Sequence, residues 1–189
     1  MRLSAGSLLA LFLIGSFCGL IGDHAAVASG TTRYLDVGGV PMIWGSPLFF
    51  PPMVGLGTVA IAELRLRIGP ARTEGGWEDG LAAVAGVLAM YLLTAFLTDE
   101  STSAATAFMA CLAAIVYARF GGGRAAVVCG VVAAVAGPAA EIAEERAGIY
   151  EYTANVNGLL GVGPWLVPLY FAFGVAVARL AELFAAHER

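Results

Sequence analysis

Hydrophobic residues are gathered into six long runs along this chain, separated by short polar stretches. The runs cover residues 3–21, 47–64, 81–98, 103–118, 125–141 and 164–184. Each is close to the roughly 20 residues that an α-helix needs to cross the hydrocarbon layer of a membrane. Because lipid offers no hydrogen-bond partners, backbone groups must bond within their own segment, which favours helices. The pattern predicts an all-α, polytopic membrane protein: one domain, residues 1–189, with six transmembrane helices and short loops.

The first run has a second interpretation. Arg2 before the apolar core and Ala26-Val27-Ala28 after it resemble a cleavable signal peptide. The apolar run is, however, longer than the roughly 7–15 residues usual for a signal core. We therefore expect this segment to be retained as the first transmembrane helix.

Composition agrees with a membrane location. Hydrophobic residues make up 59% of the chain and charged residues 13%, about half of the roughly 25% charge typical of a soluble domain. The 25 glycines and many alanines permit close helix packing in lipid, so we expect a homo-oligomer. The net charge of −4 comes with no basic stripe, and nucleic acid is not an expected partner.

All ten basic residues are arginines, and their distribution predicts an orientation. On the six-helix pattern, Arg33 and Arg146 fall on one side of the membrane. The other eight fall on the opposite side: Arg2, Arg65, Arg67, Arg72, Arg119, Arg124, Arg179 and Arg189. By the positive-inside rule, both termini are expected in the cytoplasm.

The most polar stretch, residues 138–153, holds the candidate chemistry. Glu141 and Glu145 share a helix face, with Glu144 beside them and Asp99 and Glu100 on the same side of the membrane. Such carboxylates could bind a divalent cation or act as acid and base, or they form a solvated helix end beside Arg146. Glu141 is the deepest of them, and ionisable residues within a membrane are usually functional.

Aromatic residues mark two helix starts. Tyr150, Tyr152 and Trp165 flank the sixth run, where they fit either the aromatic belt of a membrane interface or the lining of a ligand site. Phe49 and Phe50 precede two prolines, a pattern favoured in the first turn of a helix.

No cofactor or metal is expected, because the two histidines lie far apart and the three cysteines, Cys18, Cys111 and Cys129, have no paired spacing.

The order of these landmarks resembles the Insig family, small six-helix membrane proteins that sense sterols in animal cells. The segment Gly148-Ile149-Tyr150-Glu151-Tyr152-Thr153 resembles that family's Gly-Val-Tyr-Gln-Tyr-Thr, and residues 165–168, Trp-Leu-Val-Pro, resemble its Trp-Leu-Pro. Upstream, residues 49–52, Phe-Phe-Pro-Pro, are similar to its Trp-Trp-Val-Pro-Pro. The landmarks together cover nearly the whole chain.

The resemblance implies a lipid-binding cavity between helices, holding a sterol-like, diacylglycerol-like or isoprenoid molecule. We expect the polar mouth and the wall of this cavity to be formed by residues near the landmarks. The candidates are Phe49, Phe50, Met53, Glu141, Tyr150, Tyr152, Asn155 and Trp165. The all-arginine, alanine-rich composition indicates a bacterial homologue in a plasma membrane. The animal partner Scap is therefore not expected, and the stretch that the family uses to bind it carries only Asn155 and Asn157 as polar residues.

An enzyme is the alternative. Bacterial carotenoid-modifying membrane proteins of the hydratase kind have an acidic residue upstream of a similar Gly-x-Tyr-x-Tyr and a Gly-Val-Pro-rich final span. Residues 160–168 resemble that pattern too. In that case Glu141 and Glu145 would protonate an isoprenoid double bond. We expect the non-enzymatic lipid binder.

Overall fold

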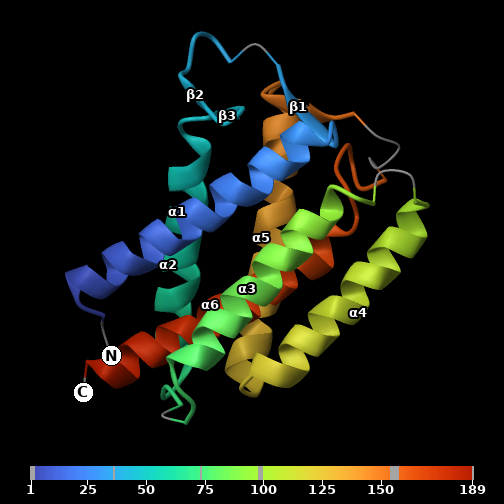
Figure 1. The fold of residues 1–189 in the computed structure, drawn as a ribbon. Coiled ribbons are helices and arrows are strands. Elements are labelled where there is room, and N and C mark those ends of the chain that lie inside the picture. The colour runs from blue at the N-terminus through green and yellow to red at the C-terminus, as the bar shows by residue number, and fades with distance from the viewer. Residues whose placement is uncertain (1–2, 36, 73, 98–99, 154–157, 189) are drawn as a thin grey trace.

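Six helices and four short strands make up the computed structural model, which describes residues 3–35, 37–72, 74–97, 100–153 and 158–188 (Figure 1). The helices are α1 Ala5–Ala28, α2 Phe50–Ile68, α3 Trp77–Thr94, α4 Thr102–Phe120, α5 Arg124–Arg146 and α6 Leu166–His187. The strands are β1 Thr32–Tyr34, β2 Met42–Ile43, β3 Ser46–Pro47 and β4 Tyr150–Tyr152. Arg2, Asp99, Asn155, Asn157 and Arg189 lie outside the described residues.

The prediction of an all-α chain is wrong in one respect, because two small sheets join the loops. β1 pairs antiparallel with β4, with Thr32 opposite Tyr152, and β2 pairs antiparallel with β3. The first pairing joins loops more than a hundred residues apart, so no local pattern marks it. Both sheets lie at the end of the bundle opposite the chain termini, called the distal end below (Figure 1).

Six apolar runs were expected to cross the membrane, but one of the six helices is not apolar enough to count as a crossing by its own composition. In the described part of the chain, five helices are long and apolar enough to cross: α1, α3, α4, α5 and α6. The exception is α2, whose last turns contain Glu63, Arg65 and Arg67. The charges that end the second apolar run therefore continue its helix.

Helix starts follow local chemistry. The Ser4 hydroxyl accepts a hydrogen bond from the Ser7 amide at the start of α1, and Ser101 caps α4 in the same way. Pro51 and Pro52 occupy the first turn of α2, where a missing amide hydrogen costs nothing. The first apolar run stops at residue 21, but its helix does not: α1 continues past Asp23 to Ala28.

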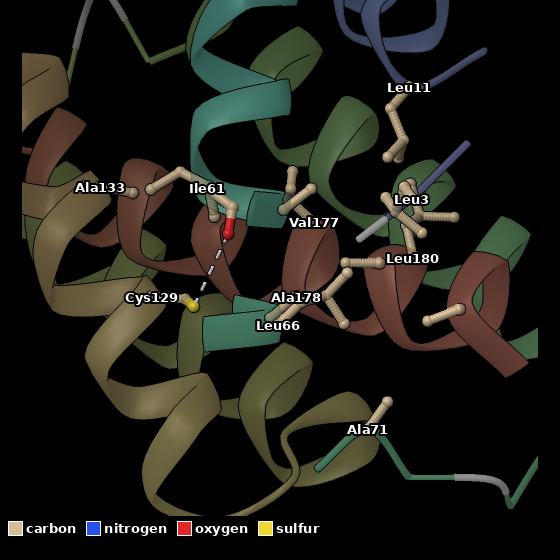
Figure 2. Close-up of a cluster of buried hydrophobic side chains, with 13 residues drawn as sticks. Leu3, Leu11, Ile61, Leu66, Ala71, Cys129, Ala133, Val177, Ala178 and Leu180 are labelled. Carbon is tan, nitrogen blue, oxygen red and sulfur yellow. Dashed lines mark hydrogen bonds between the residues drawn. The ribbon is translucent and has the colours of Figure 1, made fainter. Parts of the chain in front are cut away.

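The core is organised around α6. In its most apolar stretch 72% of residues are buried inside the protein, against 22–28% in the other four apolar helices. α5 packs so closely on α6 that a Cβ at Gly174 would lie 2.4 Å from the Cys129 carbonyl oxygen. One apolar cluster joins α1, α2, α5 and α6, with the buried Cys129 thiol 4.0 Å from the Ile61 carbonyl oxygen (Figure 2). The outer faces of the other four apolar helices, α1, α3, α4 and α5, are therefore largely exposed.

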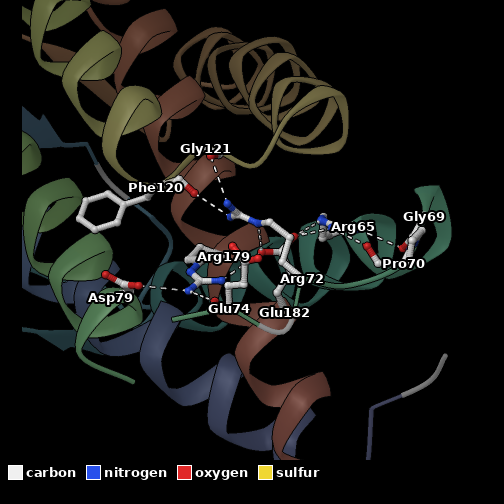
Figure 3. A network of polar contacts seen from close by, with 10 residues as sticks. All are labelled: Arg65, Gly69, Pro70, Arg72, Glu74, Asp79, Phe120, Gly121, Arg179 and Glu182. Atoms are coloured by element: carbon white, nitrogen blue, oxygen red, sulfur yellow. Dashed lines mark hydrogen bonds and ion pairs between the residues drawn. The ribbon is translucent and has the colours of Figure 1, made fainter. Parts of the chain in front are cut away.

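A charged network holds the other end together, where the termini lie (Figure 3). The buried Glu182 of α6 accepts from Arg65 Nε at 2.9 Å and from Arg72 Nε at 2.9 Å. Arg179 bonds Asp79 at 3.2 Å, and Arg119 bonds the other oxygen of Asp79 at 2.8 Å. Four of the eight arginines expected on one side of the membrane thus meet in a single network.

Candidate functional site

A largely apolar pocket lies within the bundle, between the α1–α2 pair and helices α3 and α6. It contains about 770 Å³ of empty space, counting the part open to the outside. Its walls include Ile14 and Cys18 of α1, Val54 of α2, Leu88 of α3 and Phe173 of α6. Among the described residues that line it, Glu141 of α5 is the only one with an acidic or basic side chain. A pocket with this apolar lining suits a ligand that is mostly hydrocarbon.

Glycines on α1 set the width of this pocket. A Cβ at Gly19 would lie 2.9 Å from side-chain carbons of Val54, and one at Gly22 would lie 2.0 Å from the Tyr91 ring. Real side-chain atoms do not approach so closely, so only glycine lets α1 lie this near α2 and α3.

Glu141 is held by three tyrosines from two other elements. The hydroxyls of Tyr150 and Tyr152 on β4 donate to Oε2 at 3.0 and 2.6 Å, and that of Tyr170 on α6 donates to Oε1 at 2.7 Å. Burial, then the nearby Glu141 carboxylate, raises the pKa of Tyr150 and Tyr152 well above the ordinary value. These phenols stay protonated and act as donors, which fixes the carboxylate at the pocket wall.

A second, more polar pocket adjoins the first at the distal end. The two share Phe50, Tyr91 and Glu141 as lining residues, and the second has about 400 Å³ of empty space, again counting its open part. Its lining adds Asp23, whose carboxylate accepts from Tyr34 Oη at 3.0 Å and from the Ser46 hydroxyl. No arginine, lysine or histidine is among the described residues that line either of these pockets.

The polar pocket also holds a side-chain oxygen with no partner. Thr32 Oγ1 is buried and has no hydrogen-bond partner among the described residues, and Thr32 lines this pocket. A buried polar atom left unbonded is costly, so a polar group of a ligand or a water is well placed to satisfy it.

Five of the eight candidate residues come together around these pockets. Phe50 and Glu141 line both, while Tyr150, Tyr152 and Trp165 line the polar one. Phe49 is exposed at the N-cap of α2, and neither it nor the half-buried Met53 lines either pocket. Asn155 lies outside the described residues.

The other carboxylates of the α5 end are not part of the pocket walls. Neither Glu144 nor Glu145 lines either pocket, and the Glu145 carboxyl lies against Gly161. Within the described residues, no group of three or more His, Cys, Asp or Glu side chains is arranged to hold a metal ion.

Sequence reasoning missed Asp23, Tyr91 and Tyr170. Asp23 follows the first apolar run almost directly, and an acidic residue at the edge of an apolar run is itself a signal for a functional site. The two tyrosines sit within apolar runs, and nothing in the local pattern separates them from other core aromatics.

Comparison with known proteins identifies the family. No family model matches the chain. It is 44% identical over 186 residues to an INSIG protein homolog of Mycolicibacterium vanbaalenii, covering 98% of this chain and 90% of that protein. The crystal structure of a mycobacterial Insig homolog, MvINS, superimposes with a TM-score of 0.96 at 42% identity, covering 100% of this chain and 99% of that one. A cross-linked MvINS trimer, also solved as a crystal structure, matches equally well. The chain therefore belongs to the Insig family of integral, multi-pass membrane proteins.

Proposed function

We propose that this protein is a membrane-embedded lipid binder or sensor that holds one neutral lipid, sterol-like or diacylglycerol-like, in the apolar pocket. The observation that carries the proposal is the pocket itself: an apolar slot between helices in which Glu141 is the single ionisable carboxyl among the described lining residues. The lipid's hydrocarbon part would fill the slot, and its polar end would lie toward Glu141 and the adjoining polar pocket. Affinity then comes from burying apolar surface, and orientation from a few hydrogen bonds.

The chemistry of the polar end favours an uncharged headgroup. Asp23 and Glu141 place two carboxyl groups in the polar pocket without a basic residue among its described lining. A phosphate would find no cation to pair with among those described residues, and burying an unpaired charge in surroundings of low dielectric constant is costly. A hydroxyl group can instead donate to a carboxylate oxygen or accept from a phenol.

The pocket does not favour the enzyme alternative. Protonation of a double bond by a pair of carboxylic acids would need both Glu141 and Glu145 to face the substrate. Glu141 is surrounded by three donors, and Glu145 lines neither pocket. We therefore propose binding without turnover.

We further propose that all six helices cross a plasma membrane of bacterial type, with both termini in the cytoplasm. α2 would be the sixth crossing. Its support is the antiparallel contact with α1, in which Gly15 lies against Thr58 and Gly19 against Val54. The arginine network at the terminal end fits the positive-inside rule. Homo-oligomerisation is proposed by analogy with the cross-linked MvINS trimer.

Native mass spectrometry of the protein purified in mild detergent tests the proposed function. One unmodified lipid bound per chain is the expected result. Leu88→Trp fills the pocket and should reduce lipid occupancy. Leu81→Trp should not, because Leu81 lies on the outer face of the same helix and is 66% exposed. Equal occupancy in both variants would overturn the proposed location. Conversion of an added isoprenoid that disappears in Glu141→Gln would instead support the enzyme.

A further inference from the structure

Two tight turns at the distal end carry large apolar side chains at their tips. In the first, Trp44 and Gly45 connect β2 to β3. In the second, Leu160 and Gly161 connect Leu159 to Val162, which exchange two backbone hydrogen bonds of 2.9 and 3.0 Å. The tip side chains are exposed, Trp44 by 55% and Leu160 by 63%.

Both tips adopt a backbone conformation that such residues rarely accept. φ is +52° at Trp44 and +53° at Leu160, and these are the two non-glycine residues with positive φ in the described part of the chain. A two-residue turn of this kind normally has Asn-Gly or Asp-Gly, because asparagine and glycine tolerate the left-handed region. A strained conformation kept at two exposed apolar tips indicates a role for those side chains.

The position of each turn beside a helix indicates its depth in the membrane. A Cβ at Gly45 would lie 3.2 Å from Val27, one residue before the end of α1, and His24 Nδ1 donates to the Trp44 carbonyl oxygen at 2.7 Å. Gly161 lies against Glu145, one residue before the end of α5. The turns therefore fold back beside the last turns of these helices and do not project beyond them.

Helix length places those last turns in the headgroup layer. α1 has 24 residues and α5 has 23, which at 1.5 Å per residue gives roughly 35 Å each. The hydrocarbon core of a bilayer is about 30 Å thick, so the final turn of each helix lies at its boundary.

The sequence around both tips is free of charge. No Asp, Glu, Lys, Arg or His occurs from residue 37 to 62 or from 152 to 178. Each turn thus continues, without a charged residue, into a helix of the membrane bundle. A turn that faces water, or that binds a polar partner, does not require its flanking sequence to be free of charge.

We propose that Trp44 and Leu160 insert into the headgroup layer of the surrounding bilayer and anchor the distal end of the bundle there. The partner is the lipid surface itself. The Trp44 turn connects this anchor to the polar pocket, since Ser46 of the same hairpin donates to Asp23. The anchoring is independent of whether the pocket binds a lipid.

Tryptophan quenching in nanodiscs tests this proposal on the whole protein. The variant Trp77→Phe retains Trp44 and the buried Trp165. The double variant with Trp44→Phe and Trp77→Phe retains Trp165 alone. The difference between their fluorescence emissions therefore reports Trp44. Adding Leu160→Trp to the double variant reports the second tip. At both positions we expect most of the emission to be lost to phosphatidylcholine brominated near the carbonyl end of its chains, and little to aqueous iodide. Iodide quenching without lipid quenching at either tip would overturn the proposal and favour a water-facing or protein-binding surface.

Trp44→Asn supplies a second measurement that does not depend on fluorescence. Asparagine relieves the backbone strain, so the variant should be at least as stable to heat as the wild type in detergent micelles. In nanodiscs the same variant should lose stability relative to wild type, because the anchor is gone. An equal change in micelles and nanodiscs would contradict a membrane anchor.

Discussion

The Tyr170 hydroxyl donates a 2.7 Å hydrogen bond to Oε1 of Glu141. This bond connects the central helix α6 to the one carboxyl group among the described residues that line the apolar pocket. Both residues line that pocket. The bond thus joins the packing of the bundle to the site where a lipid headgroup would be oriented.

Tyr170→Phe removes this donor and leaves the ring. A buried acceptor that loses its donor costs about 1–3 kcal/mol, so the free energy of unfolding should fall by an amount of that order. The measurement is reversible unfolding in mixed micelles. Tyr117→Phe is the control, because the Tyr117 hydroxyl has no hydrogen-bond partner among the described residues. Equal losses in the two variants would show that the Tyr170 bond does not stabilise the site.

Glu182→Gln should be among the most destabilising single changes at the terminal end. The Glu182 carboxylate and Arg65 are both almost fully buried, and Arg72 and Arg179 share the same carboxylate. Removing one partner of a buried ion pair leaves charge uncompensated, at a cost of about 3–5 kcal/mol. Unfolding in mixed micelles measures this cost.

Glu63→Gln provides the comparison for that experiment. Glu63 pairs with the exposed Arg67 one helical turn away, at 3.2 Å. Pairs of this kind contribute about 0.3–0.5 kcal/mol. A loss in Glu182→Gln no larger than in Glu63→Gln would mean that the network adds nothing to stability.

Gly22→Ala should disturb the pocket from its side wall. The added Cβ would lie 2.0 Å from the Tyr91 ring, so the ring or α1 must move. Overpacking of this kind costs about 1–3 kcal/mol, and we expect reduced lipid occupancy by native mass spectrometry as well. Gly57→Ala on α2, where a Cβ meets nothing within 4 Å, should be neutral or slightly stabilising. Unchanged occupancy in Gly22→Ala would argue against a pocket set by this contact.

The contact between the termini should depend on pH. Hydrogen bonds from the Ser4 and Ser7 side chains lower the pKa of Glu188 below its ordinary value. A lowered pKa in the folded state means that this carboxylate stabilises the fold at neutral pH, and that the effect is lost as pH falls through the lowered pKa. The wild type should therefore have a higher Tm than Glu188→Gln at pH 7. The two Tm values should converge below about pH 4. A constant difference across that range would exclude an ionised Glu188 as the cause.

Helices were predictable from the sequence because each apolar run supplies its own signal. The Insig resemblance is confirmed, and so is the helical, multi-pass membrane architecture. The number of membrane crossings was harder to predict. Glu63, Arg65 and Arg67 belong to α2 and leave it less apolar than the other five helices, so composition counts five crossings where six apolar runs were expected.

The polar half of the site was only partly predictable. Glu141, Tyr150 and Tyr152 were found because they are close in sequence, whereas Tyr170 reaches them only through the packing of α6 on α5. Phe49 and Met53 were expected to line the cavity with Phe50. A helix turns by about 100° per residue, so Phe50, Val54 and Thr58 share the pocket face instead. Asp23 becomes a pocket residue through Ser46 and Tyr34, contacts that depend on the small sheets.

The central claim is that a lipid occupies the pocket between α1, α2, α3 and α6. Photocrosslinking tests this claim most directly. The probe is a diacylglycerol with a diazirine in one acyl chain, incorporated into nanodiscs with the protein and mapped by peptide mass spectrometry. We expect crosslinks at pocket residues such as Ile14, Val87 and Phe173, and we expect unlabelled diacylglycerol to compete with them. Crosslinks confined to outward-facing residues such as Leu9, Leu56 and Leu81, with none in the pocket, would contradict it.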